Sequence, residues 1–343
     1  MVRVLIVDDS ATARHILREI LESDKRIEVV GLAADAFIAR DMIVELKPDV
    51  VCLDVEMPRM DGVTFLQKLM SHFPTPVVMV SSLTRKSAQV TLDALEAGAV
   101  DYVAKPHSNI YDGKDEIRDE LIQKVIDASY ARVQKKVPKI SIGTNRLSIA
   151  ETTKKVIAIG SSTGGTEALK VVLQGMPKNS PAIIIVQHMP DSFIAPFAAR
   201  LDSLCDIDVK VAKNGDFLEI GTAYIAQGGL HMVLRRSGAR YYIEIGEGKK
   251  VSGHCPSVDV LFNSVSKVAG ANALGVILTG MGADGAKGMF NMHQAGAKTI
   301  AQSEETCVVF GMPKEAIKLG GVDKIVPLGE ISQSIVVTLS TLS

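Results

Sequence analysis

The sequence predicts an α/β protein with two parallel, doubly wound sheets, one in each half of the chain. Two observations support this fold class. In the first half, five short apolar runs alternate with longer stretches of helical periodicity. After residue 155 the alternation resumes, with apolar runs that end in polar residues or glycine. This alternation is typical of βα units, whose parallel strands are buried on both faces.

Length and composition indicate a globular protein of about two domains. The chain has 343 residues, of which 47% are hydrophobic and 22% charged. Asp8 and Asp9 directly follow the first apolar run, so we expect no signal peptide, and no later run reaches membrane-spanning length. We therefore expect a cytoplasmic protein. The four cysteines lack CxxC spacing, which argues against a zinc knuckle or a disulfide framework: Cys52, Cys205, Cys255 and Cys307.

Charge is distributed unevenly along the chain. Residues 1–127 contain 15 Lys and Arg against 22 Asp and Glu, residues 128–155 contain 7 against 1, and residues 156–343 contain 16 against 16. The neutral second half argues against nucleic acid as its partner, because phosphate neutralisation needs a basic face. Periodicity fades in the basic segment, so we interpret residues 128–154 as a flexible linker between domains at residues 1–127 and 155–343.

The first half is expected to form a five-stranded parallel sheet. Its strands are expected at residues 4–7, 28–33, 50–53, 77–80 and 100–103, with a last helix near residues 117–126. Ligands bind such sheets at the carboxyl ends of the strands. The polar side chains at those ends are Asp8, Asp9, Asp54, Ser81 and Lys105.

Three carboxylates at one edge of a sheet repel one another unless a cation joins them. Oxygen ligands with an open coordination sphere suit magnesium, and one carboxylate is then free to attack a phosphoryl group. Lys105 can pair with the anion, and Ser81 can hydrogen-bond to the product. Any one of these residues alone is better explained as a helix N-cap or a solvated turn. Their order after successive strands favours a phosphoryl-transfer site.

This half resembles the receiver domain of bacterial two-component response regulators, which has a flavodoxin-like fold. The residues that carry the resemblance are Asp8, Asp9, the run 53–62 (LDVEMPRMDG), Ser81 and Lys105-Pro106. Tyr102 occupies the place of the family's switch aromatic, and the resemblance makes Ser81 and Lys105 its companion switch residues.

The resemblance to receivers has two chemical implications. It implies phosphorylation of Asp54 by a histidine kinase. It also implies a magnesium ion held by Asp9 and Asp54, with assistance from Asp8 and from the backbone carbonyl of Glu56.

The second half opens on a glycine-rich turn, residues 160–165 (GSSTGG), between an apolar run and a stretch of good helix formers. We expect a strand, a tight turn and a helix. Ser162 is the centre of a Gly-x-Ser-x-Gly pattern, which can lift a serine hydroxyl above a strand end. Ser162 is therefore a candidate nucleophile. From this motif alone, a phosphate-binding loop and a plain turn capped by Ser or Thr remain alternatives.

His188 follows the next buried run, residues 181–186. Consecutive strands usually lie side by side, so His188 and Ser162 are expected at the same edge, where His188 can accept the serine proton. A structural histidine is the alternative. A dinucleotide site would need an acidic residue after this strand. Gln187 and His188 stand there instead.

The segments that follow mix strands and helices. We expect a helix at residues 193–201, a strand at 207–211, a hairpin at 217–226 that turns at Gly221, and a second hairpin at 230–245. Both hairpins are expected to extend the sheet with antiparallel strands. Later helices are expected at about residues 256–268, 312–317 and 331–342.

A third buried run, residues 274–278, ends in the glycine-rich segment 279–285 (TGMGADG). Its backbone amides, those near Met281 among them, can point at a developing oxyanion. Asp284 is expected to open the next helix, where it can be a plain N-cap. Because it follows a strand end, it can instead orient His188 through the second ring nitrogen.

Ser162, His188 and Asp284 thus follow three separate buried strands. In α/β-hydrolases the acidic member precedes the histidine, so the order Ser, His, Asp predicts a different fold with the same constellation. Asp191 and Asp259 are weaker candidates for the acid. Asp191 is expected to cap the helix after Pro190, and Asp259 to favour the first turn of a later helix.

With the receiver upstream, essentially the whole chain resembles the CheB family of chemotaxis protein-glutamate methylesterases. The motifs that carry the resemblance are residues 160–165, 187–190 (QHMP), 254–259 (HCPSVD), 278–285 (LTGMGADG) and 310–313 (FGMP).

This resemblance implies hydrolysis of γ-glutamyl methyl esters and deamidation of certain glutamines on chemoreceptors. It implies no cofactor in the second half, so magnesium belongs to the receiver alone. The implied partners are methyl-accepting chemotaxis receptors and a chemotaxis histidine kinase, for a protein peripheral to receptor arrays and not inserted in the membrane. The residues to which it assigns roles are Ser162, His188 and Asp284 in catalysis, and Thr163, Met281 and His254 around the oxyanion.

Regulation follows as a hypothesis. If the unphosphorylated receiver packs over the edge that carries Ser162, phosphorylation of Asp54 shifts the packing and uncovers it. Two other outputs stay open. A non-catalytic binding output would share the whole first half, whereas a DNA-binding output would need a basic recognition helix that the neutral second half does not supply.

Overall fold

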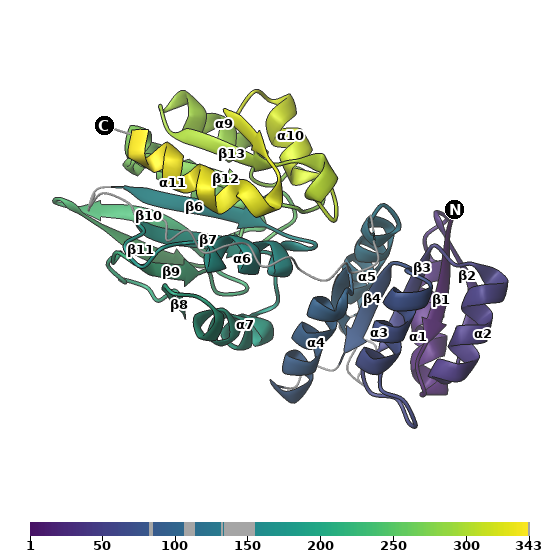
Figure 1. The fold of residues 1–343 in the computed structure, drawn as a ribbon. Coiled ribbons are helices and arrows are strands. Elements are labelled where there is room, and N and C mark those ends of the chain that lie inside the picture. The colour runs from purple at the N-terminus through teal and green to yellow at the C-terminus, as the bar shows by residue number, and fades with distance from the viewer. Residues whose placement is uncertain (82–84, 106–113, 132, 134–154, 342–343) are drawn as a thin grey trace. The chain divides into compact units, whose positions relative to one another are not determined.

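The computed structural model describes residues 1–81, 85–105, 114–131, 133 and 155–341. The chain divides into two compact units, residues 1–140 and 141–343, and each has its own main sheet (Figure 1). Most of the linker predicted at residues 128–154 lies outside the described residues, and the last helix of the first unit runs to Ser129. No helix in the described parts of the chain combines the length and apolar character needed to cross a membrane.

The first unit contains the predicted five-stranded parallel sheet, and its strand order is β2-β1-β3-β4-β5 (Figure 1). The strands are β1 (Val2–Val7), β2 (Ile27–Ala33), β3 (Val50–Asp54), β4 (Val77–Ser81) and β5 (Asp101–Ala104). The helices are α1 (Ala11–Glu22), α2 (Ala36–Leu46), α3 (Gly62–His72), α4 (Arg85–Ala97) and α5 (Lys114–Ser129). The strand order reverses at β1, so the carboxyl ends of β1 and β3 are neighbours at the usual ligand edge.

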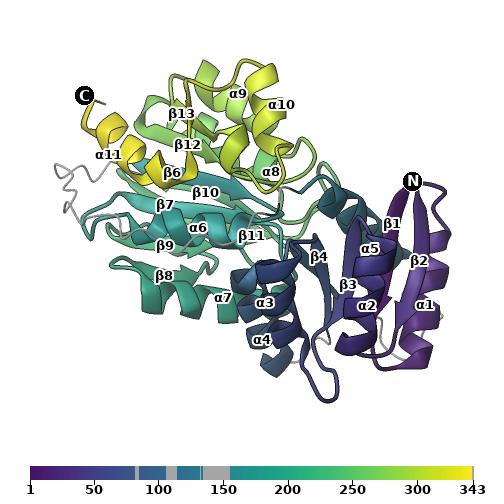
Figure 2. The same cartoon turned by 45° about the vertical axis from the view of Figure 1, so that its right-hand side comes forward.

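Burial and capping explain these elements. Every residue of β3 and β4 is buried, because α1 packs against α5 while α2, α3 and α4 pack in succession (Figure 2). Ser10, Asp35 and Asp61 are the N-caps of α1, α2 and α3, and each side chain accepts a hydrogen bond from a backbone N–H of the first turn. Such a cap contributes about 1 kcal/mol to helix stability. The loops at the ligand edge therefore end at well-defined helix starts.

The second unit is built on a seven-stranded sheet with the order β14-β13-β12-β6-β7-β9-β8, in which all neighbours are parallel. Its strands are β6 (Val156–Ser161), β7 (Ala182–Gln187), β8 (Asp208–Val211), β9 (Thr222–Ile225), β12 (Ala273–Ile277), β13 (Lys298–Gln302) and β14 (Lys324–Val326). A separate antiparallel hairpin consists of β10 (His231–Ser237) and β11 (Arg240–Gly246). The helices are α6 (Gly165–Gln174), α7 (Asp191–Leu204), α8 (Val258–Val268), α9 (Ala286–Gln294), α10 (Met312–Lys318) and α11 (Ile331–Thr341).

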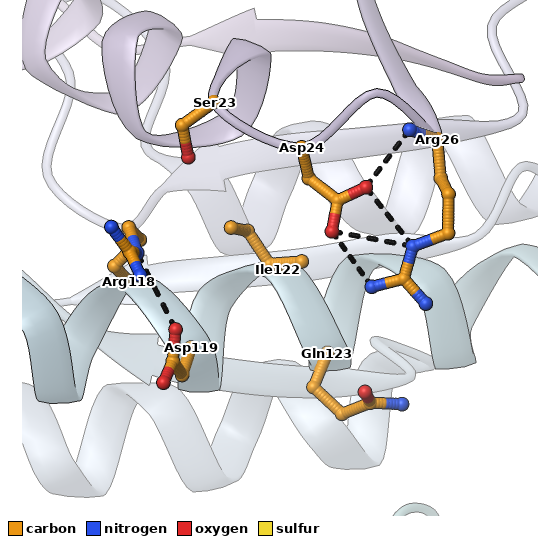
Figure 3. Close-up of a pocket in the computed structure, with 7 residues that line it drawn as sticks. All are labelled: Ser23, Asp24, Arg26, Arg118, Asp119, Ile122 and Gln123. Atoms are coloured by element: carbon orange, nitrogen blue, oxygen red, sulfur yellow. Dashed lines mark hydrogen bonds and ion pairs between the residues drawn. The ribbon is translucent and has the colours of Figure 1, made fainter.

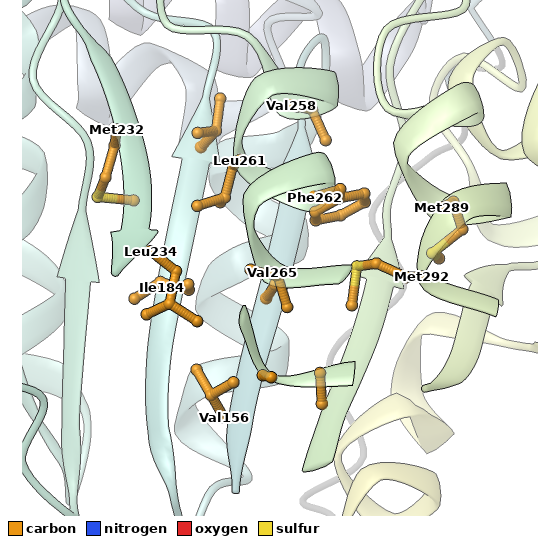
Figure 4. Close-up of a cluster of buried hydrophobic side chains, with 14 of the residues drawn as sticks. Val156, Ile184, Met232, Leu234, Val258, Leu261, Phe262, Val265, Met289 and Met292 are labelled. Atoms are coloured by element: carbon orange, nitrogen blue, oxygen red, sulfur yellow. The ribbon is translucent and has the colours of Figure 1, made fainter. Parts of the chain in front are cut away.

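The main core of this unit lies between the sheet, α8 and the hairpin. Alternate residues of β6 and β7, among them Val156 and Ile184, face this core, and Figure 4 shows Leu261, Phe262 and Val265 of α8 packed among them. Burying side chains of this size contributes about 1.5–3 kcal/mol each. α8 is thereby held against β6, which places its N-terminal turn near the strand ends.

The predicted hairpin at Gly221 is wrong. β8 and β9 pair in parallel, with Asp208 opposite Thr222, and the connection between them bonds to β11 instead. The Gly215 N–H donates to the Ile243 carbonyl and the Leu218 N–H donates to the Tyr241 carbonyl. Because these hydrogen bonds to β11 hold the connection in place, the chain passes from β8 to the parallel strand β9 without an intervening helix.

The second predicted hairpin is confirmed as β10-β11, although it forms a two-stranded sheet of its own and does not extend the larger sheet. It packs on α8. Two strands were not predicted. β13 has five residues and β14 only three, too short for a clear periodic pattern, yet they complete one side of the sheet.

Candidate active site

Ser162 and His188 stand at the ends of adjacent strands. Ser161, the last residue of β6, is paired with Gln187, the last residue of β7. The His188 N–H donates to the Ser161 carbonyl over 3.1 Å, which continues this register beyond the strands. The expected common edge is therefore present, with Ser162 and His188 in equivalent positions on neighbouring strands.

A tight turn holds Ser162 between β6 and α6. The Ser162 N–H donates to the Thr279 carbonyl over 3.0 Å, and the Ser162 carbonyl accepts from the Gly165 N–H over 2.7 Å and from Gln187 Nε2 over 3.0 Å. A Cβ atom on Gly165 would lie 2.2 Å from Gln187 Oε1, so only glycine fits there. Gly164, the N-cap of α6, has a φ of 76°, a conformation that favours glycine. The glycines thus allow the tight turn to form, and the Ser162 side chain remains partly exposed.

Asp284 holds the ring of His188. His188 Nε2 lies 2.9 Å from Asp284 Oδ2, and the Asp284 side chain is 1% exposed. The N-terminus of α8 supplies the other hydrogen bonds that the Asp284 carboxylate accepts. Asp284 accepts hydrogen bonds from Ser257 Oγ (2.7 Å), the Val258 N–H (2.8 Å) and the Asp259 N–H (3.0 Å).

These bonds fix the charge of Asp284. Burial alone would raise the pKa of Asp284, but the hydrogen bonds from His188, the α8 amide of Asp259 and Ser257 hold it below its usual value. The expectation that Asp284 opens the next helix is wrong, because α9 begins at Ala286 with Gly285 as its N-cap. The Asp284 carboxylate instead accepts hydrogen bonds from the N-terminus of α8, about 25 residues earlier in the chain.

The two ring nitrogens of His188 have different surroundings. Because Nε2 faces a carboxylate, it carries the proton, and Nδ1 presents a lone pair. Nδ1 is buried and has no hydrogen-bond partner among the residues that the structure describes. A buried basic nitrogen without a partner is costly in a folded protein. An imidazole nitrogen with a free lone pair can accept a hydroxyl proton, which is the chemistry expected of a general base.

The two rival acids bond elsewhere. Asp191 is the first residue of α7, whose N-cap is Pro190, so the predicted cap at Asp191 is wrong. Its carboxylate accepts from the Gly228 N–H over 3.2 Å. Asp259 accepts from the Gly288 N–H over 2.7 Å. Within the described residues, the His188 ring bonds to Asp284 and to neither rival.

The candidates around the oxyanion have different surroundings. Gly280 lies directly against Ser162, since a Cβ atom on Gly280 would be 2.8 Å from the Ser162 Cβ, so the loop that carries Met281 lies next to the serine. The Thr163 carbonyl accepts from Thr279 Oγ1 over 3.0 Å, which ties the two loops together. His254 stacks on His188, with ring centroids 3.6 Å apart and ring planes within 7° of parallel.

The contacts of two residues at the site were not predicted from the sequence. Gln187 accepts from Ser161 Oγ and donates to the Ser162 carbonyl, and Ser257 donates to Asp284. The position of Gln187 at a strand end could have suggested a role, and Ser257 has the type of an N-cap, which it also is. That it bonds to Asp284 depends on the packing of α8.

In the first unit, Asp8, Asp9 and Asp54 converge. One carboxylate oxygen from each lies within 4.8 Å of the others. Lys105 Nζ lies 2.8 Å from both Asp8 Oδ2 and Asp54 Oδ2. Burial raises the pKa of Asp54 to about 6 against the opposing effect of Lys105. Three clustered oxygen ligands suit a hard divalent cation such as magnesium.

Of the expected switch residues, Lys105 contacts this cluster directly. Ser81 is buried at the end of β4, and its Oγ accepts from Thr91 Oγ1 over 2.9 Å. Tyr102 is 3% exposed, and burial raises the pKa of its hydroxyl well above the usual value. Lys124 Nζ lies 4.7 Å from the centroid of the Tyr102 ring and donates to the Tyr102 carbonyl.

A hollow on the first unit carries no comparable chemistry. Figure 3 shows it between α5 and the loop after α1. Its charged groups already pair with one another, Arg26 with Asp24 over 2.7 Å and Arg118 with Asp119 over 3.4 Å. The clusters around Ser162 and Asp54 therefore remain the candidate sites.

Comparison with known proteins assigns a different family to each of the two units. Residues 157–335 match the family described as CheB methylesterase, and residues 4–112 match the response regulator receiver domain. The chain is 56% identical to a protein-glutamate methylesterase/protein-glutamine glutaminase of Sulfurimonas denitrificans, over 99% of each chain. It is 54% identical to the protein of the same name from Salmonella typhimurium, over 99% of this chain and 97% of that one.

A solved structure supports the fold of the second unit. The crystal structure of the Thermotoga maritima CheB methylesterase catalytic domain is 38% identical, with a TM-score of 0.53, and the match covers 55% of this chain and all of that one. With a receiver domain in its first unit and the methylesterase domain in its second, the chain belongs to the CheB methylesterase family.

Proposed function

We propose that this chain is a phosphorylation-activated hydrolase that removes methyl groups from γ-glutamyl methyl esters, and deamidates certain glutamines, on chemoreceptors. The observation that carries the proposal is the bond between His188 and the buried Asp284, beside the turn that presents Ser162. The names of the relatives, which specify methylesterase and glutaminase activities, support the substrate class.

The proposed reaction is acyl transfer through an acyl-enzyme. Ser162 Oγ attacks the side-chain carbonyl carbon of the substrate while His188 Nδ1 takes the hydroxyl proton. Asp284 stabilises the imidazolium that forms. Backbone amides in the loop of Met281, which lies against Ser162, are the candidates to stabilise the oxyanion. His188 gives the proton to the leaving methoxide oxygen or amide nitrogen, so that methanol or ammonia departs, and water then hydrolyses the acyl-enzyme by the same steps.

We further propose that Asp54 is the phosphorylated residue. Asp8, Asp9, Asp54 and the backbone carbonyl of Glu56 would hold magnesium, which when bound neutralises charge on the phosphoryl oxygens. Lys105, which already bridges Asp8 and Asp54, would pair with the phosphoryl group. Ser81 would hydrogen-bond to it from the end of β4. The proposed phosphodonor is a chemotaxis histidine kinase.

The most informative experiment measures methanol release from membranes that contain methylated chemoreceptors, with and without a small phosphodonor. We expect release to rise when the phosphodonor is added, and Asp54→Asn to abolish the rise while basal release remains. Asp41→Asn, on the exposed face of α2, is the matched control and should respond like the wild type. If phosphorylated protein releases no methanol at all, the second unit has a non-catalytic binding output and the proposal is wrong.

Removal of residues 1–150 should raise basal methanol release, because the unphosphorylated receiver is proposed to restrain the second unit. The sheet of the second unit begins at Val156, so the truncation spares its structure. Basal rates of the fragment and the full chain are compared at equal active-site concentration, after circular dichroism has shown that the fragment is folded. Unchanged or lower activity in a folded fragment would contradict restraint by the receiver.

A further inference from the structure

We propose that the loop at residues 249–257 positions the general base, with His254 as the positioning residue and His231 as the clamp that holds the loop. The inference rests on the proposed function of His188 as the base. It assigns a physical task to a histidine that takes no part in the covalent steps.

The contact between the two rings is close and nearly parallel. The ring centroids of His188 and His254 are 3.6 Å apart and the planes differ by 7°. His254 is itself only partly exposed, and the His188 side chain is 7% exposed. A ring stacked at this distance blocks rotation of His188 about its Cβ–Cγ bond and excludes water from one face. The bond to Asp284 fixes one edge of the imidazole, and the stack fixes its plane.

The loop that presents His254 is built as a tight turn. Val251 and His254 exchange two backbone hydrogen bonds of 3.0 Å each. Between them, Ser252 and Gly253 have φ values of 52° and 85°, which is the pattern of a two-residue turn with both central residues in the left-handed region. The Cys255 carbonyl accepts a further bond from the Gly229 N–H. His254 is thus held by backbone bonds on both sides.

His231 joins the two ends of this loop. Its Nε2 lies 2.9 Å from the Lys249 carbonyl oxygen, and its Nδ1 accepts from the Ser257 N–H over 3.3 Å. A carbonyl needs a donor and an N–H needs an acceptor, so the ring is the neutral tautomer with its proton on Nε2. The same Ser257 donates through Oγ to Asp284. The His231 imidazole therefore links the loop that carries His254 to Ser257, which donates a hydrogen bond to Asp284.

The stacked ring also bears on the chemistry at His188. When Ser162 gives up its proton, His188 becomes a cation whose face lies against the His254 ring. An uncharged aromatic face attracts a cation, so an uncharged His254 ring makes this contact more favourable after proton transfer than before it. Interactions that strengthen toward the transition state raise kcat more than they lower KM.

Three substitutions in the full-length protein separate the ring face of His254 from its nitrogens and its bulk. His254→Ala removes the ring, His254→Leu keeps apolar bulk, and His254→Phe keeps a flat aromatic face. We expect kcat for receptor demethylation to fall by about 10-fold to 100-fold in the Ala and Leu variants, with KM within about twofold, because the base is misplaced rather than the substrate. The Phe variant should keep at least about a third of wild-type kcat.

His231→Phe tests the clamp, since it keeps volume but offers neither hydrogen bond. His231→Phe should lower kcat, as His254→Leu is expected to do. His293→Asn, at an ion pair on α9, is the matched control and should leave kcat and KM unchanged. Equal losses in His254→Phe and His254→Ala would overturn the proposal, because they would mean that the ring nitrogens matter and not the face. Wild-type kcat in His254→Ala or in His231→Phe would overturn it as well.

A spectroscopic measurement keeps this test independent of activity. In protein labelled at its 7 histidines, the Nε2 proton of His188, bonded to Asp284, should give an exchange-protected NMR signal, assigned by its loss in His188→Gln. We expect the signal to persist in His254→Phe and to broaden by exchange with water in His254→Ala and His254→Leu. An unbroadened signal in the Ala variant would overturn the positioning role. If the wild type hydrolyses no ester, the proposed function fails while this signal still reports on the stack.

Discussion

Ser162→Ala is expected to abolish methanol release from methylated receptors, with kcat at least about 10⁴-fold below the wild type. Without the hydroxyl no acyl-enzyme forms, and water would have to attack an unactivated carbonyl. The loss should be the same with and without phosphodonor, because phosphorylation is proposed to control access and does not supply a nucleophile. Methanol is measured by gas chromatography of the headspace over receptor membranes.

Phosphorylation of the first unit provides an internal control for Ser162→Ala. Labelling of Asp54 by a phosphodonor should be unchanged, since the two chemistries belong to separate units. Ser203→Ala, at an exposed serine near the end of α7, should retain full activity. Turnover by Ser162→Ala above a few per cent of the wild type would eliminate Ser162 as the nucleophile, whatever the result with the phosphodonor.

Asp284→Asn is expected to lower kcat by about 10⁴-fold, as in other triads where the acid is replaced by its amide. The amide provides one acceptor oxygen where the carboxylate now serves four donors. Its NH₂ group would face either the His188 Nε2–H or an amide of α8, and so would force the wrong tautomer or a broken bond. Asp191→Asn, at the rival acid that bonds to Gly228, should retain most activity.

The same replacement should change how stability depends on pH. The pKa of Asp284 is held below its usual value in the folded protein. Its charged form therefore contributes stability that is fully present above the unfolded-state pKa of about 3.9 and is lost as pH falls through the lower folded value. Asp284→Asn should be less stable at pH 7, and the difference should shrink below about pH 4. Urea unfolding followed at pH 7 and pH 3.5 measures this; an equal difference at both values would contradict it.

The edge of the sheet was predictable because it depends on local signals. Ser162 and His188 each follow a continuous apolar run, and parallel strands that are consecutive in the chain tend to be neighbours. That rule alone brings the two residues together. In the first unit, the rule that ligands bind at the carboxyl ends of parallel strands placed Asp8 and Asp54 at one edge of the sheet, where Lys105 bridges them.

Contacts that depend on packing between distant segments were not predictable. The bond between Ser257 and Asp284 requires α8 to dock with its N-terminus toward the strand ends, and the stack of His254 on His188 requires a loop closed by His231. Neither arrangement leaves a periodic signal. The wrong hairpin at Gly221 has the same origin, since the glycine suggested a reversal while bonds to β11 direct the chain onward into a parallel strand.

The way Asp284 is bonded ties hydrolytic competence to completion of the fold. Its carboxylate is satisfied only when β12, β7 and the first turn of α8 have all come together, because its partners come from residues 188 and 257–259. A chain still emerging from the ribosome lacks Asp284 until most of the second unit has been made. Under the proposed mechanism, ester hydrolysis thus reports the finished domain, and premature or partly unfolded chains carry the serine without the carboxylate proposed to hold its base.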